Sequence, residues 1–325
     1  MRRFCIIAAV AAAVLSGCGS GKSTAKEPLT RDFATIKAPA MMTDYLEIMT
    51  YVGANFWNNV FADTTRGYLC ESLHIAGIES IAFEEQIGMF STIMGMIAVE
   101  DARQDVAILF DKVSEAQLRE PESNVFERTN ELINKYLYDP NSPVRYEDLY
   151  GVWASRLSES PLVSAGMRQA YAMDAKMCAL NAVGTKAADF EFVDLKGRRH
   201  SLYSVKAPLT LLFFSNPGCE ACAEIIRAIN GNSMITEMIG SGELAVVNVY
   251  IDEEIARWKE CAADYPDAWL NGYDPSFSIR TDITYNVRAI PSLYLLAGDK
   301  TVLMKDAPPE NVFERLESLA SGRDR

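Results

Sequence analysis

The chain has 325 residues, which is enough for two domains of ordinary size. Its 44 acidic residues outnumber its 31 basic ones, and the formal net charge of −13 argues against nucleic-acid binding because an acidic surface repels phosphate backbones. Seven cysteines are too few for a fold held together by disulfides.

The N-terminus has the pattern of an export signal. Arg2 and Arg3 precede an apolar run over residues 4–15, which is too short to span a bilayer of about 30 Å. The letters LSGC that follow, ending in Cys18, resemble the bacterial lipoprotein box. Residues 1–17 are therefore predicted to be a lipoprotein signal peptide, and Cys18 is predicted to be the lipidation site.

The resemblance implies that Cys18 becomes the new N-terminus and carries acyl chains. Two or more such chains are needed for stable membrane anchoring. Residues 18–38, rich in small and charged side chains, are predicted to form a flexible tether. We expect the protein in the cell envelope, facing the periplasm. Gly19, rather than an acidic residue, follows the cysteine and favours the outer membrane. An ordinary cleaved signal with an incidental cysteine is the alternative.

The same stretch partly matches a phosphate-binding loop, which needs a glycine, four residues and then Gly-Lys-Ser. Gly21, Lys22 and Ser23 supply the end of that pattern, but Ser16 stands where the leading glycine belongs. A phosphate loop also follows a buried strand and opens a helix, and neither pattern is present around it. Nucleotide binding is therefore not predicted.

Apolar residues recur at helical spacing over residues 39–182, as the run Met42, Leu46, Met49, Val52, Phe56 and Val60 illustrates. This region is predicted to be an all-α domain, a bundle of six or seven helices. Ser160 followed by Pro161 is typical of a helix start. Trp57 is expected to pack in the core of the bundle.

Strand patterns replace helical ones over residues 183–325. Residues 189–205 alternate around Lys196-Gly197 and predict a β-hairpin, and residues 292–304 predict a second hairpin. The apolar runs 209–215 and 244–251 are typical of buried central strands, with one or two helices between them. This order predicts an α/β domain of the thioredoxin-like class, with a central mixed sheet flanked by helices.

Cys219 and Cys222 lie three residues apart where the first central strand meets a helix. Residues at this spacing share one face of a helical turn, near enough for a disulfide. The helix N-terminus stabilises a thiolate, so Cys219, the more exposed of the two, is predicted to attack and Cys222 to resolve. Pro217 and Gly218 turn the chain away from the strand and leave the sulfur uncovered.

Other uses of the cysteine pair are less well supported. A zinc site needs two more ligands, and the only histidines are His74 and His200. A copper-delivery domain needs a histidine late in the domain, and a peroxidatic cysteine needs a serine or threonine where Asn216 stands. A structural disulfide remains open, although a four-residue loop crosslinks little chain entropy. No metal or organic cofactor is expected beyond a redox-active disulfide.

Residues 183–325 resemble the TlpA/ResA-type thioredoxin family of envelope oxidoreductases. The resemblance rests on the stretches VGTKAADFEFVDLKGRRHSL, LLFFSNPGCEAC and YNVRAIPSLYLL. It implies transfer of electrons between protein dithiols and disulfides. The region before it resembles an uncharacterised N-terminal domain of such lipoproteins in Bacteroidetes.

The family resemblance also implies a cis-proline opposite the cysteine pair. Pro291 stands just before a predicted strand, where a cis Ile290-Pro291 bond is favoured. The Ile290 backbone would then pair with an extended substrate segment, and Gly218 is expected to border that segment. An ordinary proline at the start of a strand is the alternative.

The sequence departs from the family at several positions. Gly218 replaces a tryptophan, and Glu220-Ala221 replaces Gly-Pro or Pro-Pro. Glu220 opposes the helix dipole beside the thiolate, which favours a more reducing protein. Phe213 stands at the place of the buried carboxylate of thioredoxin, so the proton of Cys222 needs another acid. Glu224 and Asp252 are the candidates.

The expected function is that of a lipid-anchored envelope thiol-disulfide oxidoreductase. Its expected partners are proteins with disulfides or dithiols and an upstream envelope reductase. The alternative is a binding or scaffold lipoprotein that uses the thioredoxin fold without catalysis. Cys70, Cys178 and Cys261 are expected to be buried and free, with a Cys70–Cys178 crosslink left open.

Overall fold

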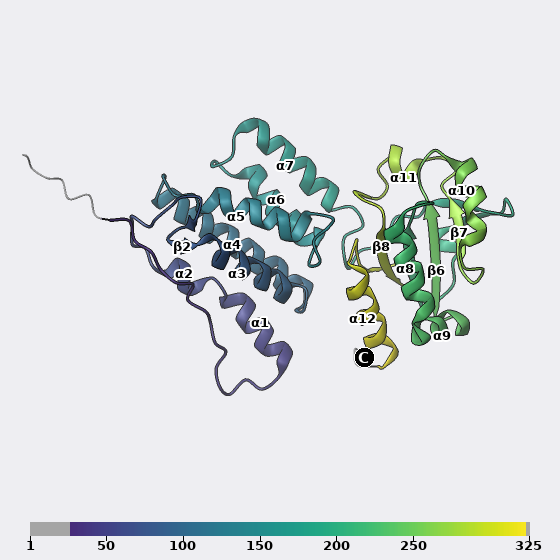
Figure 1. The fold of residues 1–325 in the computed structure, drawn as a ribbon, viewed down its shortest axis with the longest axis horizontal. Coiled ribbons are helices and arrows are strands. Elements are labelled where there is room, and N and C mark those ends of the chain that lie inside the picture. The colour runs from purple at the N-terminus through teal and green to yellow at the C-terminus, as the bar shows by residue number, and fades with distance from the viewer. Residues whose placement is uncertain (1–26, 323–325) are drawn as a thin grey trace, which may run out of the picture.

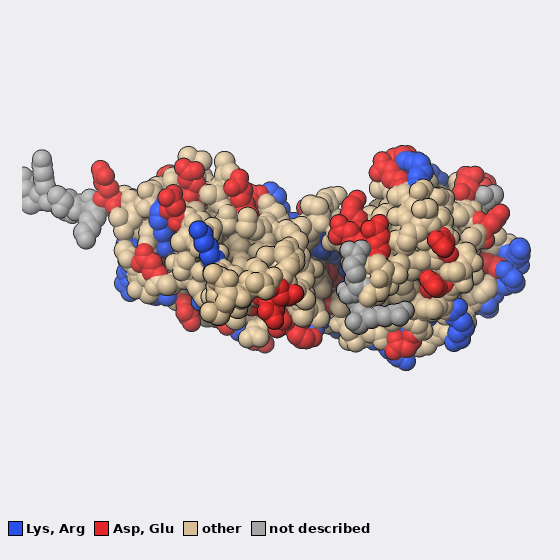
Figure 2. Space-filling view, turned by 90° about the horizontal axis from the view of Figure 1, so that it is seen from below, with Lys and Arg blue, Asp and Glu red and all other residues tan. Residues whose placement is uncertain are grey.

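The computed structural model describes residues 27–322, so the predicted signal peptide and Cys18 lie outside the described residues. The chain folds into a helical lobe followed by an α/β lobe (Figure 1). A constriction separates the two lobes, and acidic side chains are spread over both (Figure 2). Among the described residues, none of the helices combines the length and apolar composition needed to cross a membrane.

The helical lobe confirms the predicted bundle, with seven α-helices among its described residues. They are α1 (Tyr45–Asn55), α2 (Asn58–Ala62), α3 (Ser80–Met94), α4 (Val99–Arg119), α5 (Val125–Ile133), α6 (Glu147–Glu159) and α7 (Ala165–Cys178), with a π-helical turn η1 (Asn134–Tyr138) after α5. Trp57 is 3% exposed and contacts the rings of Phe56, Phe83 and Phe90. The interpretation of Trp57 as a core residue is thus confirmed.

One local prediction for this lobe is wrong, and one small element was not predicted. The unpredicted element is an antiparallel hairpin of β1 (His74–Ile75) and β2 (Ile78–Glu79). Ala76 and Gly77 both have positive φ, as a two-residue hairpin turn requires. Ser160 ends α6 instead of starting the next helix, and the hydroxyl of Ser164 caps α7 by accepting from a backbone N–H.

Part of the segment before α1, residues 29–33, contacts the helical lobe. The Leu29 amide donates to the carbonyl of Gly67, and the Arg31 guanidinium donates to the carbonyls of Val60 and Ala76. Phe33 packs against Trp57 at a ring distance of 5.3 Å. Residues 29–33 therefore pack against the helical lobe, through the half-buried ring of Phe33 and the hydrogen bonds that Leu29 and Arg31 donate.

An unpaired acid lies in the core of the helical lobe. Asp105 on α4 is 6% exposed, and its Oδ2 atom has no hydrogen-bond partner among the described residues. Burial, together with the neighbouring charge of Asp101, raises the pKa of Asp105 to about 6. Its ionised form therefore destabilises the folded state at neutral pH.

We expect Asp105→Asn to raise the free energy of unfolding at pH 7.5 by about 2 to 3 kcal/mol, at roughly 1.4 kcal/mol per pKa unit. The folded pKa of Asp105 lies above the unfolded one, so the wild type loses stability relative to Asp105→Asn as the pH rises from about 4 to about 6. Urea titrations of both proteins across this range measure the difference. A difference in unfolding free energy between wild type and Asp105→Asn that does not change with pH would show that Asp105 does not have the raised pKa.

The α/β lobe contains a seven-stranded sheet in the order β4-β3-β7-β6-β5-β8-β9. Its strands are β3 (Glu191–Asp194), β4 (Arg199–Ser201), β5 (Leu209–Phe214), β6 (Leu244–Tyr250), β7 (Leu270–Tyr273), β8 (Ser292–Ala297) and β9 (Val302–Met304). Strands β5, β6 and β7 are parallel, and β8 is antiparallel to β5. Both predicted hairpins are present, as β3–β4 and β8–β9.

Helices cover both faces of this sheet (Figure 1). They are α8 (Glu220–Gly231), α9 (Ser233–Ser241), α10 (Ile255–Cys261), α11 (Ser278–Thr281) and α12 (Pro309–Ala320), with single turns η2 (Leu202–Ser204) and η3 (Ala262–Asp264). Along β5, Leu212 and Phe214 face one core, whereas Leu211 and Phe213 face the other. The mixed sheet flanked by helices confirms the predicted thioredoxin-like fold.

Candidate redox site

The cysteine pair lies between the end of β5 and the start of α8. Cys219 and Cys222 form a disulfide, with their Cα atoms 5.2 Å apart. Cys219 is the N-cap of α8, and its Sγ accepts the backbone N–H of Cys222 at 3.1 Å. A thiolate at this position would receive the same N–H and the positive end of the helix dipole, both of which stabilise negative charge.

The two sulfurs differ in their access to solvent. Cys222 is 2% exposed and packs in the core that contains Phe213, whereas Cys219 is half-buried at the edge of that core. This order of exposure is the one the sequence predicted. Of the two cysteines, Cys219 is therefore the one that a second molecule can reach more readily.

Gly218 gives the loop its shape. Its φ is +73°, a conformation that glycine adopts without steric cost. A Cβ atom at this position would lie 3.4 Å from the guanidinium of Arg257, which reaches over from α10. On the other side of Cys219, the carboxylate of Glu220 is paired with Arg227 at 2.9 Å. Arg227 thus partly offsets the Glu220 charge, an effect that was not predicted.

The Ile290–Pro291 peptide bond is cis, as predicted. It directly precedes β8, whose first residue, Ser292, pairs with Phe214 at the end of β5. Ile290 is packed against the core that contains Cys222. Antiparallel pairing of β8 with β5 thus brings the cis-proline to the same end of the sheet as the cysteines, although about 70 residues separate them in the sequence.

The two candidate proton acceptors lie in different surroundings. The Asp252 carboxylate accepts from the Asn216 side chain at 2.7 Å and pairs with Arg280 at 2.6 Å, so it is tied to the loop that carries Cys219. Glu224 is exposed on α8. Asp252 also lines a shallow hollow beyond β6. Proton transfer to or from Cys222 stays a prediction for both acids.

The remaining cysteines of the described region are free. Cys178 is buried, as expected, and burial raises the pKa of its thiol. Cys70 and Cys261 are half-buried, so the expectation that all three are buried is wrong for them. The thiol of Cys70 lies 3.7 Å from the hydroxyl of Ser123, and the open question of a Cys70–Cys178 crosslink is settled against it.

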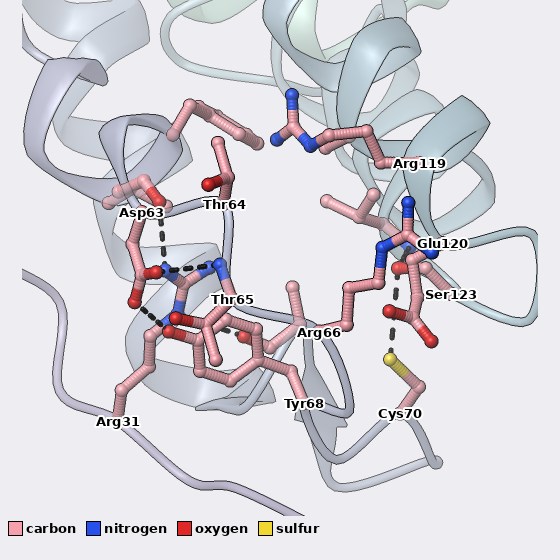
Figure 3. A pocket seen from close by; sticks show the side chains of 15 residues that line it. Arg31, Asp63, Thr64, Thr65, Arg66, Tyr68, Cys70, Arg119, Glu120 and Ser123 are labelled. Carbon is pink, nitrogen blue, oxygen red and sulfur yellow. Dashed lines mark hydrogen bonds between the residues drawn. The ribbon is translucent and has the colours of Figure 1, made fainter.

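A further hollow lies in the helical lobe (Figure 3). Arg31, Arg66 and Arg119 line it, together with the carboxylates of Asp63 and Glu120. Because side chains of both signs line it, its charge selects no ligand class. Among residues 27–322, no group of three or more His, Cys, Asp and Glu side chains is placed to hold a metal ion.

The fold, the cysteine pair at a helix N-terminus and the cis-proline define a thioredoxin-like protein. A thioredoxin-like protein from Bacteroides caccae is 31% identical, with a TM-score of 0.72 over 88% of this chain and 98% of that one. Residues 17–179 match the family described as a domain of unknown function, DUF5106. The chain belongs to this family and, through its second half, to the thioredoxin-like proteins.

Two other solved structures are similar to the second half alone. The C-terminal domain of an uncharacterized protein from Bacteroides fragilis is 42% identical, covering 43% of this chain and 99% of that one, with a TM-score of 0.42. A domain of a possible thiol-disulfide isomerase from Cytophaga hutchinsonii is 24% identical, covering 44% and 95%, with a TM-score of 0.38. No curated protein matches the chain.

Proposed function

We propose that this protein is a thiol-disulfide oxidoreductase of the cell envelope, similar to the TlpA/ResA type. The observation that carries the proposal is the Cys219–Cys222 pair at the N-terminus of α8, with one sulfur accessible and the other buried. A purely structural disulfide needs neither the helix N-terminus nor this difference in access. The cis Ile290–Pro291 bond at the same end of the sheet supports the same conclusion.

The reaction begins with both cysteines reduced. The Cys219 thiolate attacks one sulfur of a substrate disulfide, and the other substrate sulfur leaves as a thiolate and takes up a proton. The Cys222 thiolate, having given up its proton, then attacks Sγ of Cys219. The second substrate sulfur leaves as a thiolate and takes up a proton, so two electrons and two protons have passed to the substrate while the Cys219–Cys222 disulfide forms.

Three residues around the pair are proposed to hold the substrate. The backbone of Ile290, presented by the cis bond to Pro291, would pair with an extended segment of the substrate protein. Gly218 would border that segment, because it adds no side chain beside the reactive sulfur. An upstream envelope reductase would return two electrons to the disulfide, and no organic cofactor takes part.

The proposed location rests on the N-terminal sequence. The basic and apolar residues 2–15 and the letters LSGC that follow are typical of a lipoprotein, with acyl chains on Cys18. The protein would then face the periplasm from a membrane. Gly19 after the cysteine favours the outer membrane.

We expect Cys219→Ser to bring insulin reduction, with dithiothreitol as electron donor, down to the uncatalysed rate, because the serine hydroxyl cannot form a mixed disulfide. Cys261→Ser is the matched control, since Cys261 is also half-buried but has no partner cysteine, and its activity should equal wild type. Equal, negligible activity in wild type and Cys219→Ser would instead favour a non-catalytic binding lipoprotein.

A further inference from the structure

We propose that the helical lobe positions the cis-proline segment of the redox site, and that Arg288 and Asp306 are the positioning residues. The proposal rests on the proposed function, because it assigns these residues a role in binding a protein substrate. Arg288 is two residues before Ile290, and Asp306 holds the residue that follows Pro291.

Arg288 connects the segment to the helical lobe. One of its terminal nitrogens donates to the backbone carbonyl of Tyr138, and its guanidinium lies 4.0 Å from the centre of the Tyr138 ring. The other terminal nitrogen is 3.2 Å from the Asp306 carboxylate. The side chain of Arg288 is only 12% exposed, so water cannot readily replace these partners.

Asp306 connects the same arginine to the start of β8. Its carboxylate accepts from the hydroxyl of Ser292 at 2.7 Å, within the buried interior. Its backbone carbonyl accepts from Arg145 of the helical lobe at 2.8 Å. Contacts from both lobes therefore meet at Asp306. Hydrogen bonds fix the chain before the cis bond, at Arg288, and after it, at Ser292.

This arrangement predicts a selective effect on catalysis. A protein substrate must align an extended segment with the Ile290 backbone, so a shift of residues 288–292 weakens its binding. A small disulfide without a peptide backbone makes no such contact and needs only the Cys219 thiolate. Loosening the network should thus raise KM for a protein substrate while leaving the reaction with a small disulfide unchanged.

The test uses Arg145→Met, which removes a contact made from the helical lobe, and Arg288→Lys as a second variant. Each should raise KM for insulin on the order of tenfold, with turnover of hydroxyethyl disulfide unchanged. Arg156→Met is the matched control, because Arg156 lies on α6 of the same lobe and pairs with Asp111 at the surface, away from the cis-proline segment. An unchanged KM, or an equal rise in Arg156→Met, would overturn the proposal.

Hydrogen exchange of the oxidised proteins gives a readout that needs no enzymatic activity. Amides of residues 287–293 should exchange on the order of tenfold faster in Arg145→Met than in wild type, while β5 and β6 keep their protection. Unchanged exchange over residues 287–293 would reject the positioning role even if insulin reduction is normal. Faster exchange in a protein without insulin reduction would leave the positioning of the segment supported and reject only the proposed function.

Discussion

We expect Lys305→Met to lower the free energy of unfolding by about 3 to 5 kcal/mol, the usual cost of removing one partner from a buried ion pair. The side chain of Lys305 is 1% exposed, at the junction of the two lobes. Its ammonium donates to the carbonyls of Cys178 and Leu180, each at 2.6 Å. Methionine fills a similar volume but offers no donor and no charge.

The loss of charge matters most because two carboxylates face the ammonium. Glu147 and Asp148 lie 3.6 and 3.7 Å from it, and each side chain is 1% exposed. Burial already raises the pKa of Glu147 despite the neighbouring cations. Without Lys305, Glu147 still accepts a hydrogen bond from Asn286. The carboxylates of Glu147 and Asp148 then carry two buried negative charges with one fewer cation beside them.

Denaturant unfolding at pH 7 measures this effect. Lys135→Met is the matched control, because Lys135 pairs with Glu84 at the surface and its removal should cost less than about 1 kcal/mol. The deficit of Lys305→Met should shrink as the pH is lowered, because the pKa of Glu147 is raised by burial and its protonation removes one uncompensated charge. A deficit as small as that of Lys135→Met, or one that grows on acidification, would contradict this account.

Local patterns predicted the elements that carry the site. An unbroken apolar run, Leu211 to Phe214, predicts a strand that is buried on both faces. The two cysteines follow this strand at helical spacing. A proline before the run that forms β8 was enough to expect the cis bond. Each of these features is determined by residues that are close together in the chain, so a single sequence is enough to predict it.

Features that depend on distant partners were not predicted. Arg145 and Asp306 are 161 positions apart, and nothing near either of them indicates the other. The positions of Arg31 and Phe33 have the same origin, because their partners lie in α2, the β1–β2 hairpin and the aromatic core. Arg257 approaches Gly218 only because α10 folds back over the loop. In each case tertiary contacts, rather than composition, decide the conformation.

We expect Cys222→Ser to convert the protein into a trap for its substrates. With Cys222 absent, the mixed disulfide on Cys219 has no internal thiolate to release it. An intramolecular attack is favoured over one from solution by a high effective concentration, so turnover should fall at least about a hundredfold while covalent complexes accumulate. Non-reducing gels of envelope extracts should show these complexes, and dithiothreitol should dissolve them.

Cys219→Ser is the informative control, because it keeps Cys222 but removes the accessible sulfur. Since Cys222 is 2% exposed, its thiol should capture almost nothing. Capture by Cys219→Ser but not by Cys222→Ser would reverse the two roles, and equal capture by both would point to the half-buried Cys70 or Cys261. The difference between the two variants thus depends on the position of the remaining sulfur, because Cys219 is half-buried at the N-terminus of α8 whereas Cys222 is 2% exposed.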